Sequence, residues 1–289
     1  MIRLVERSQL NVEKYNTCIT ISKQSRIYAY SWYLDIVADN WSVLVLDDYN
    51  AVMPLPWKSK FMIHYISQPF FSQQLGVFSK EELTTIESES FIDNIPKHFL
   101  KIALQFNSGN HILNDKTEMK NNFILDLNSS YEELYKSFSK GRKHAIQKGL
   151  RNEFIVEEVQ FNEVLKLSKE NYSFKELSEN DYLKLSTLIR VAKDKKQAKI
   201  IGIIVNDELI GGSVFLLDSK RIVYLFSAVS SKGKEMQVGS LLLNSIIKEF
   251  SNSKLILDFE GSMNPSIASF FKSFGSKIET YLLFKKRLL

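Results

Sequence analysis

An acid and a lysine near the end of this 289-residue chain are spaced so that they could meet in one cleft. Glu260 directly follows residues 254–259, an apolar run typical of a buried strand, and Lys272 lies on the amphipathic segment that comes next. Ligand sites on α/β sheets usually lie beyond such strand ends, where a carboxylate could accept a proton from a reacting amine. Glu260 could equally cap the following turn or pair with Lys272. Lys272 could simply extend into solvent from a helix whose phenylalanines are buried.

The elements that must position these residues follow from hydrophobic spacing in the second half of the chain. A capping box, Ser130 with Glu133, begins a helix that runs to about residue 139. A second helix should cover 142–148 and stop at Gly149. We then expect a strand at 153–159, helices at 162–170 and 180–193, strands at 198–205, 209–217 and 222–227, a helix at 236–250, a strand at 254–259, a helix at 266–274 and a strand at 277–286.

The first half has a less distinct version of the same order. It predicts a helix at 30–37, a hairpin of strands 41–46 and 51–55, and a strand at 61–67. A second capping box, Ser79 with Glu82, should begin a helix that runs to about residue 94, and strands follow at 98–106 and 122–127. The sequence therefore predicts an α/β (α+β) chain of two similar small domains, residues 1–127 and 128–289.

Composition limits the function classes. Hydrophobic content of 44% and charged content of 25% are ordinary for a globular protein. A net charge of +5 favours anionic ligands such as nucleotides, coenzyme A, tRNA or anionic lipid, although a solvated basic surface explains it equally well. Cys18 is the single cysteine, and the four histidines lack metal-ligand spacing, so we expect no disulfide and no metal. The chain shows neither a signal peptide nor an apolar run that could span a membrane, and we expect a cytoplasmic location.

The element order of the second half resembles the GNAT acyltransferase superfamily, in which a Gly-rich loop opens a helix and holds the coenzyme A pyrophosphate. The corresponding piece here runs from Ala228 and Val229 through Lys234 to Gly239 and Ser240. Lys234 stands at the first position of that loop and Gly239 at its last, whereas Gln237 replaces the first glycine. An ordinary helix start after a basic loop is the alternative. No tyrosine stands at the general-acid position of many coenzyme A-dependent members, where Phe271 lies nearest.

Three short segments resemble the Fem-type peptidoglycan bridge aminoacyltransferases, which are tandem GNAT proteins that use aminoacyl-tRNA. They are Gln68-Pro-Phe-Phe-Ser-Gln73-Gln74-Leu-Gly76, Ser139-Lys-Gly-Arg142-Lys143-His-Ala-Ile-Gln-Lys-Gly149 and Phe270-Phe271-Lys272-Ser-Phe274-Gly275. The similarity spans about residues 40–289, and the broader group of short Fem-like GNAT proteins matches more closely in length. It implies two GNAT-like domains, each a mixed, mostly antiparallel sheet flanked by helices.

The resemblance also implies roles for individual residues. Lys272 would stabilise the negative charge on the reacting carbonyl, and Arg142, with Lys143 nearby, would contact the phosphates of the acceptor. The donor would be acyl-CoA or aminoacyl-tRNA, and the acceptor an amine on a small molecule, a sugar nucleotide or a cell-wall precursor. We expect the acceptor between the domains, against Gln73, Gln74 and Arg142. A solvated helix face is the alternative for Arg142 and Lys143, and a catalytically idle binding module for a nucleotide- or lipid-linked anion is the alternative for the whole protein.

Overall fold

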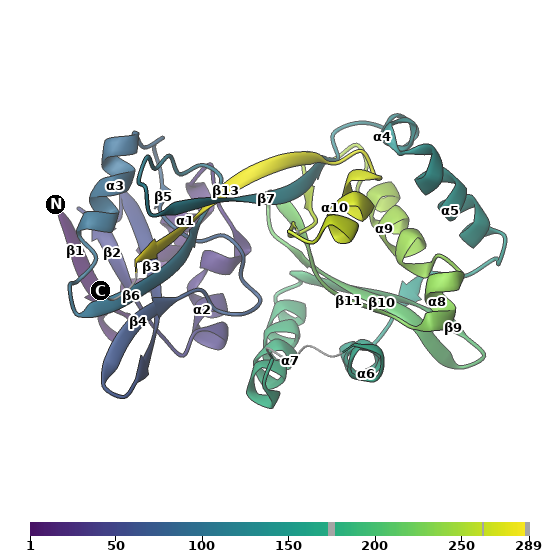
Figure 1. The fold of residues 1–289 in the computed structure, drawn as a ribbon, viewed down its shortest axis with the longest axis horizontal. Helices are drawn as coiled ribbons and strands as arrows, with labels where there is room; N and C mark the ends of the chain where they lie inside the picture. Colours follow the sequence, from purple (N-terminus) through teal and green to yellow (C-terminus); the bar gives the residue numbers. More distant parts are fainter. Residues whose placement is uncertain (173–176, 262, 287–289) are drawn as a thin grey trace. The chain divides into compact units, whose positions relative to one another are not determined.

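The computed structural model describes residues 1–172, 177–261 and 263–286 (Figure 1). Its backbone contacts divide the chain into two compact units. The first contains Met1–Asn121 together with Glu279–Leu289, and the second contains Asn122–Ile278. Strands β7 (Thr117–Asp126) and β13 (Lys277–Lys286) are therefore each divided between the units. The division into domains 1–127 and 128–289 stays a proposal.

The first unit contains a mixed sheet. Its strand order is β1 (Ile2–Glu6), β2 (Asn40–Leu46), β3 (Ala51–Lys60), β4 (Ile63–Ser67), β6 (Phe99–Phe106) and the end of β13, and β5 (Phe78–Ser79) pairs with β3. All of these pairings are antiparallel except that of β4 with β6. The helices of this unit are η1 (Arg7–Gln9), α1 (Val12–Ile21), η2 (Ile27–Ala29), α2 (Ser31–Val37) and α3 (Thr85–Asp93).

The second unit has a sheet in the order β7, β12 (Ile256–Asp258), β11 (Arg221–Val229), β10 (Glu208–Leu217), β9 (Ala198–Val205) and β8 (Glu157–Glu158). The helices are α4 (Tyr131–Ser137), α5 (Lys140–Leu150), α6 (Phe161–Asn171), α7 (Glu179–Asp194), α8 (Ser231–Glu235), α9 (Val238–Glu249) and α10 (Pro265–Lys272). The one parallel pairing, β11 with β12, covers only Arg221–Val223, whereas β11 continues to Val229. The two strands therefore separate, which leaves room for a ligand beside the end of β11.

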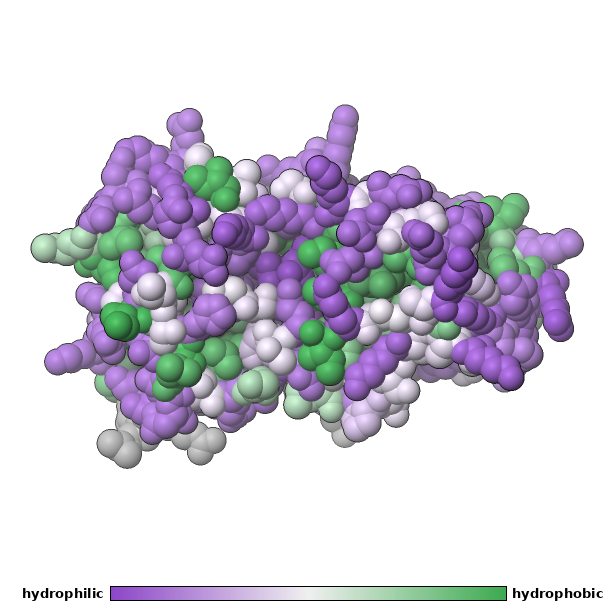
Figure 2. Space-filling model, turned by 90° about the horizontal axis from the view of Figure 1, so that it is seen from above, coloured by the Kyte–Doolittle hydropathy of each residue, from purple (hydrophilic) through white to green (hydrophobic). Residues whose placement is uncertain are grey.

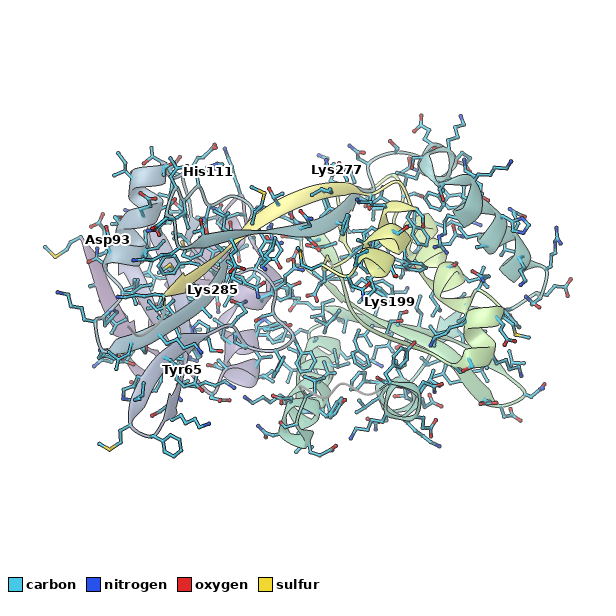
Figure 3. All side chains as sticks on the ribbon, viewed as in Figure 1. Tyr65, Asp93, His111, Lys199, Lys277 and Lys285 are labelled. Carbon is cyan, nitrogen blue, oxygen red and sulfur yellow. The ribbon has the colours of Figure 1, made fainter. Side chains whose placement is uncertain are left out.

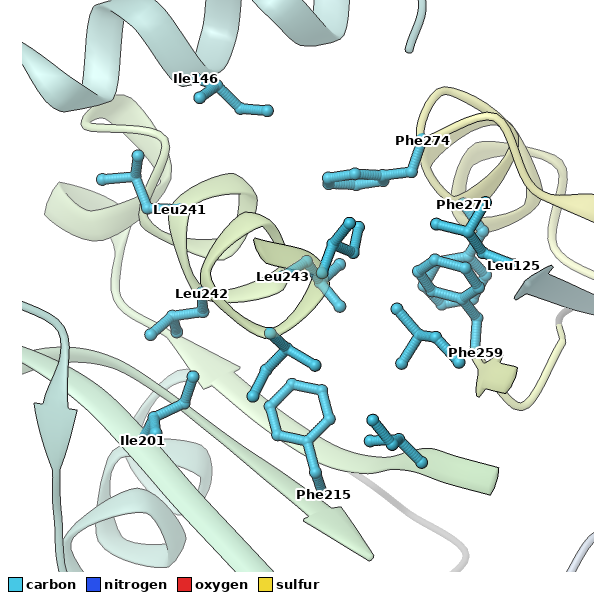
Figure 4. Close-up of a cluster of buried hydrophobic side chains, with 14 of the residues drawn as sticks. Leu125, Ile146, Ile201, Phe215, Leu241, Leu242, Leu243, Phe259, Phe271 and Phe274 are labelled. Atoms are coloured by element: carbon cyan, nitrogen blue, oxygen red, sulfur yellow. The ribbon is translucent and has the colours of Figure 1, made fainter. Parts of the chain in front are cut away.

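Burial of the apolar faces explains these elements. Helix α9 is apolar almost all round and lies in the core of the second unit (Figure 4), where Leu242 and Leu243 are fully buried. The ring centroid of Phe259 lies there 5.0 Å from that of Phe271 and 6.1 Å from that of Phe274. On the face drawn in Figure 2, hydrophilic residues predominate and apolar side chains form small separate groups. Within the described residues, no helix is both long and apolar enough to cross a membrane.

The fold class is confirmed, with mixed, mostly antiparallel sheets flanked by helices, and strand 277–286 has the predicted bounds. The capping box at Ser130 is also confirmed. The predicted capping box at Ser79 is wrong, because Ser79 belongs to strand β5 and pairs with Ala51. Thr84 and Glu87 form the box of helix α3 instead.

Three further predictions in the second half are wrong in their bounds. Helix α5 continues through Gly149, which is glycine because a Cβ there would lie 2.9 Å from Leu241 of α9. The strand predicted at 153–159 is reduced to β8, Glu157–Glu158. The helix predicted at 236–250 is preceded by the short helix α8, and Gln237 separates the two with a left-handed φ of 63°. In the first half, the sequence analysis missed β1 and α1.

Candidate functional site

A pocket of about 400 Å³ opens where β11 runs past the end of β12, beside the start of α9 and along α10. Its walls are mostly aromatic or aliphatic, with a few polar groups at one side. The described lining residues are Tyr172, Tyr224, Ser227, Val229, Lys234, Gln237, Gly239, Ser240, Ile267, Phe270 and Phe271. Lys234 is the only charged residue among these described lining residues, and none of them carries a carboxylate.

Arg142 is not among the described lining residues of this pocket, but it contacts two of them, Ser240 and Phe270, and joins three segments that are distant in sequence. Its Nε donates to Ser273 Oγ at 2.9 Å, and its Nη1 donates to Ser240 Oγ. The guanidinium carbon lies 4.2 Å from the ring centroid of Phe270 and 4.7 Å from that of Phe274. Two aromatic rings and two serine hydroxyls therefore hold a half-buried cation.

The guanidinium of Arg142 carries a positive charge that no carboxylate neutralises in the described part of the chain. Burial lowers its pKa to about 10. At neutral pH the group is still protonated, so the folded protein keeps a partly desolvated cation against neutral partners. Such a cation is an attractive site for an anionic group, which would supply the missing counter-charge.

Local contacts fix the backbone that presents Arg142. Ser139 caps helix α5 by accepting from the Arg142 backbone N–H at 3.1 Å, and the Ser139 N–H donates to the Ser273 carbonyl at 2.9 Å. The start of α5 is thereby tied to the end of α10. Gly275 has a φ of +76°, and a Cβ at that position would lie 2.1 Å from Ser137 Oγ. The glycine of the Phe-Lys-Ser-Phe-Gly segment is thus required by this close contact.

The first turn of α9 forms the polar side of the pocket. Its N-terminal residues, Val238 and Gly239, occupy positions whose backbone N–H groups have no partner within the helix. A Cβ on Gly239 would lie 3.7 Å from Val229, an ordinary contact, so Gly239 is not needed for space. Gly233 is needed, because a Cβ there would lie 2.1 Å from the Ile210 carbonyl oxygen. A helix N-terminus with Arg142 beside it favours a phosphate or another anion.

Two tyrosines that the sequence analysis did not select face this pocket. The ring of Tyr224 stacks on Phe215 at 5.3 Å and meets Phe271 edge-on at 6.2 Å. Burial raises the pKa of Tyr224, and hydrogen bonds to Ser227 and Ser213 partly oppose that rise. Its hydroxyl therefore stays protonated at neutral pH and is available as a hydrogen-bond or proton donor.

The other tyrosine, Tyr172, bonds to the end of β11. Its hydroxyl donates to the Val229 carbonyl oxygen at 3.1 Å and accepts from the Val229 N–H at 3.3 Å. The Lys234 ammonium lies 4.8 Å from the Tyr172 ring centroid. No local sequence signal distinguishes either tyrosine, because aromatic residues are ordinary in strands and at the ends of helices. Only the separation of β11 from β12 shows that they face an open space.

The residues predicted to bind the donor fall mainly on one surface. Val229, Lys234, Gly239 and Ser240 line the pocket, whereas Ala228 is fully buried and does not. Arg142, predicted to contact the acceptor, contacts Ser240, which is predicted to bind the donor. Both roles stay predictions.

Lys143, predicted to bind the substrate near Arg142, contacts a neighbouring helix, and its predicted role stays a prediction. Its ammonium donates to the Lys136 carbonyl at 2.8 Å and lies 5.7 Å from the Tyr135 ring centroid. Lys143 therefore contacts helix α4 rather than the pocket.

The two residues predicted to be catalytic are not among the described pocket lining. Lys272 is exposed at the end of α10, with its ammonium 5.6 Å from the ring centroid of Phe123. Glu260 is partly buried after β12 and has a left-handed φ of 55°. Its backbone N–H donates to Asp258, which is 1% exposed and pairs with Arg221 at 2.8 Å. Asp258 is thereby engaged in a buried ion pair, and the roles of Lys272 and Glu260 stay predictions.

Gln73 and Gln74 lie in the first unit, in a buried polar network. The Gln74 side-chain oxygen accepts from the Arg26 guanidinium at 3.1 Å and from the Ser108 N–H at 3.0 Å. Its amide nitrogen donates to the Gln73 side-chain oxygen at 2.9 Å. Arg26 is 2% exposed and also pairs with Glu279 at 3.5 Å. In this unit Gln74 therefore holds the loop that contains it, and its predicted part in substrate binding stays a prediction.

Two other candidates for chemistry have defined surroundings. Cys18 is buried, its thiol faces the Asn50 and Phe78 carbonyls, and burial raises its pKa to about 11. It is therefore not a thiolate at neutral pH. Among the described residues, no group of three or more histidine, cysteine, aspartate or glutamate side chains is placed to hold a metal ion.

Comparison with solved structures places this arrangement in a known fold. No protein-family model matches the sequence, and no curated protein sequence matches it. The structure of FemX superposes with a TM-score of 0.68 at 11% identity, covering 94% of this chain and 96% of FemX. The fold is GNAT-like, as the sequence predicts.

Two further solved structures share that fold. A tandem GNAT protein from the clavulanic acid biosynthesis pathway has a TM-score of 0.53 at 10% identity, with 99% of this chain and 98% of that chain covered. L-PGS from Bacillus licheniformis has a TM-score of 0.51 at 15% identity, with 94% and 91% covered.

Proposed function

We propose that this protein is an N-acyltransferase whose acyl donor carries phosphate groups and binds in the pocket between β11, α9 and α10. The observation that carries the proposal is Arg142, a half-buried cation with no carboxylate partner in the described chain, placed beside the first turn of α9. Phosphate would meet the guanidinium and the free N–H groups of that turn. The apolar remainder of the pocket would hold the rest of the donor.

The proposed chemistry needs few groups. An amine attacks the carbonyl carbon of a thioester or ester, a C–N bond forms, and the C–S or C–O bond breaks. The leaving sulfur or oxygen must gain a proton, and Tyr224, whose raised pKa keeps its hydroxyl protonated, faces the pocket where that group would lie. We assign Glu260 as the acceptor of the amine proton and Lys272 as the cation for the carbonyl oxygen. Both assignments rest on the sequence.

The donor and acceptor are proposed by class. The GNAT-like fold is compatible with acyl-CoA or aminoacyl-tRNA, and both supply the phosphate that Arg142 would bind. The resemblance of three sequence segments to the Fem-type peptidoglycan bridge aminoacyltransferases makes an amine on a cell-wall or sugar-nucleotide precursor our proposed acceptor. The predicted cytoplasmic location belongs to the same proposal.

Titration calorimetry with acetyl-coenzyme A tests the donor site. Binding in the micromolar range would support a coenzyme A-dependent transferase, and charged tRNA is the next titrant if no heat is detected. The variant Lys272→Ala then tests the reacting centre, since Lys272 is exposed and its loss should leave the melting temperature nearly unchanged while activity falls. Full activity in Lys272→Ala would remove it from the mechanism.

One observation favours a second candidate, a binding module without turnover. The Tyr172 hydroxyl occupies both backbone groups of Val229, at the strand end where a reacting carbonyl would need a donor. Gln237, in place of a glycine, stands at the start of α9. Such a module would bind a nucleotide- or lipid-linked anion without transferring a group. Ligand binding without product, measured by mass spectrometry after incubation with donor and amine, would support it.

A further inference from the structure

The turn between β3 and β4 presents two large apolar side chains to solvent. Phe61 and Met62 are its central residues and are 86% and 94% exposed. Both have positive φ, 49° and 61°. Two-residue hairpin turns of this kind strongly prefer Asn-Gly, because other side chains are strained there. Phe-Met at this position therefore costs stability and gains no burial within the described chain.

The strands that carry the turn extend its apolar and basic character. Lys60 pairs with Ile63 and Lys58 with Tyr65, so these side chains share one face of the hairpin. Ile63 is 43% exposed, and the Tyr65 side chain lies on β4, two residues beyond Ile63 and above the turn in Figure 3. The hairpin extends from the rest of its unit, as the ribbon shows (Figure 1).

A bulge in the neighbouring strand adds two more exposed residues. The register between β4 and β6 shifts between His64 and Tyr65, which pair with Phe99 and Lys101. Leu100 lies in the shifted stretch and is 40% exposed, and Lys101 is also exposed. We call the combined surface the hairpin patch. It consists of Lys60, Phe61, Met62, Ile63, Tyr65, Leu100 and Lys101.

The charge of the hairpin patch is uniformly positive. Lys60 and Lys101 form no ion pair in the described residues, and the Lys60 ammonium lies 5.5 Å from the Phe61 ring centroid. Lys58, lower on the same strand, pairs with Asp39 at 3.1 Å. Apolar side chains at a projecting tip, with a tyrosine and free lysines behind them, match the layers of a lipid interface. Acyl chains lie innermost, and anionic headgroups lie at the surface.

We propose that the hairpin patch docks this protein onto the surface of a bilayer that contains anionic lipid. Phe61 and Met62 enter the interface, Tyr65 lies at the level of the headgroups, and Lys60 and Lys101 attract the anionic lipids. The proposal concerns the first unit alone and does not depend on the acyltransferase function. It also gives the strained turn a purpose, since the apolar residues that oppose folding there would contribute to binding.

Vesicle flotation of the full chain tests the proposal, with vesicles of phosphatidylcholine containing about one third phosphatidylglycerol. The wild type should float with these vesicles and not with pure phosphatidylcholine. The double variant Phe61→Asn/Met62→Gly should lose ~tenfold or more in partition coefficient, because two large apolar groups are removed. The partition coefficients of Lys60→Ala and Lys101→Ala should each be ~fivefold lower than that of the wild type. Added salt should lower the partition coefficient of the wild type by a similar factor.

The double variant is chosen so that misfolding cannot explain its loss. Asn-Gly suits the turn better than Phe-Met, so its melting temperature should be equal to or higher than that of the wild type. Leu113→Asn is the matched control, since Leu113 is 87% exposed in the same unit but outside the hairpin patch. It should float like the wild type.

Three outcomes would overturn the proposal. The first is a wild type that does not float with anionic vesicles, and the second is a double variant that floats equally well. The third is concentration-dependent self-association in analytical ultracentrifugation that the double variant abolishes, which would assign the hairpin patch to a second copy of the chain.

Discussion

Replacing Arg142 with methionine should separate ligand binding from stability. Methionine keeps the apolar packing between Phe270 and Phe274 but removes the charge and the bonds to Ser273 and Ser240. Because the folded protein holds this cation without a carboxylate partner in the described chain, we expect its removal to affect an anionic ligand far more than the fold.

Two opposite effects of Arg142→Met on the free energy of unfolding nearly cancel. The lowered pKa indicates that burial opposes the charge, by about 1–2 kcal/mol once the half-exposed position of Arg142 is allowed for. Removing the charge recovers that penalty, while each lost serine hydrogen bond costs about 1 kcal/mol. The free energy of unfolding should therefore stay within about 1 kcal/mol of the wild type, equal to a melting shift of ~2–4 °C.

In ligand binding, by contrast, no second effect offsets the loss of the Arg142 charge. A charge-assisted contact between guanidinium and phosphate is worth about 2 kcal/mol, so the Kd for a phosphate-bearing donor should rise ~30-fold. Titration calorimetry with acetyl-coenzyme A, or with charged tRNA if the former does not bind, measures it. Arg151→Met is the control, because Arg151 is exposed at the end of the same helix and its loss changes net charge equally.

Two results would refute this reasoning. If Arg142→Met binds the donor as tightly as the wild type does, the guanidinium is not a ligand group. If its melting temperature falls by more than ~10 °C while Arg151→Met is unchanged, Arg142 is chiefly structural.

The pH dependence of stability offers a separate check. The folded pKa of about 10 is below the ordinary arginine value, so the unfolded chain binds more protons at higher pH. Relative to Arg142→Met, the wild type should therefore gain stability as the pH rises above about 10.

Three further predictions concern packing and burial. Gly275→Ala should lower the free energy of unfolding by about 2–4 kcal/mol in thermal denaturation, because of its positive φ and the 2.1 Å approach. Gly141→Ala, on a helix with nothing within 4 Å, should be neutral or slightly stabilising, and equal losses in both variants would refute the steric argument. Asp258→Asn should cost about 3–5 kcal/mol, because it removes the carboxylate charge that pairs with the buried Arg221 guanidinium, and an unchanged urea midpoint would show that the pair adds nothing. Cys18 should resist a thiol reagent at pH 8 until the protein unfolds, since burial raises its pKa to about 11, and prompt labelling of the native protein would contradict its burial.

The sequence predicted well what local pattern controls. Strand 277–286, the capping box at Ser130 and the hairpin-linked strands of the second unit depend on side-chain period and short-range capping, which can be read directly. The second capping box failed because Ser79 pairs with a strand far from it in sequence, and that pairing outweighs its capping preference.

The sequence alone also selected Arg142, Phe270, Phe274 and Ser240 as members of family-like segments. It could not show that they meet, because Arg142 is 131 residues from Ser273 and 98 from Ser240, and contacts at that separation depend on how α5, α9 and α10 pack. Only the tertiary structure decides that the Phe-Lys-Ser-Phe-Gly segment encloses Arg142, and that β11 separates from β12 to leave a pocket with Tyr224 in its wall. The sequence determines the type of each side chain. Packing determines how far that side chain is buried, which residues it contacts, and that Arg142 has no carboxylate partner in the described chain.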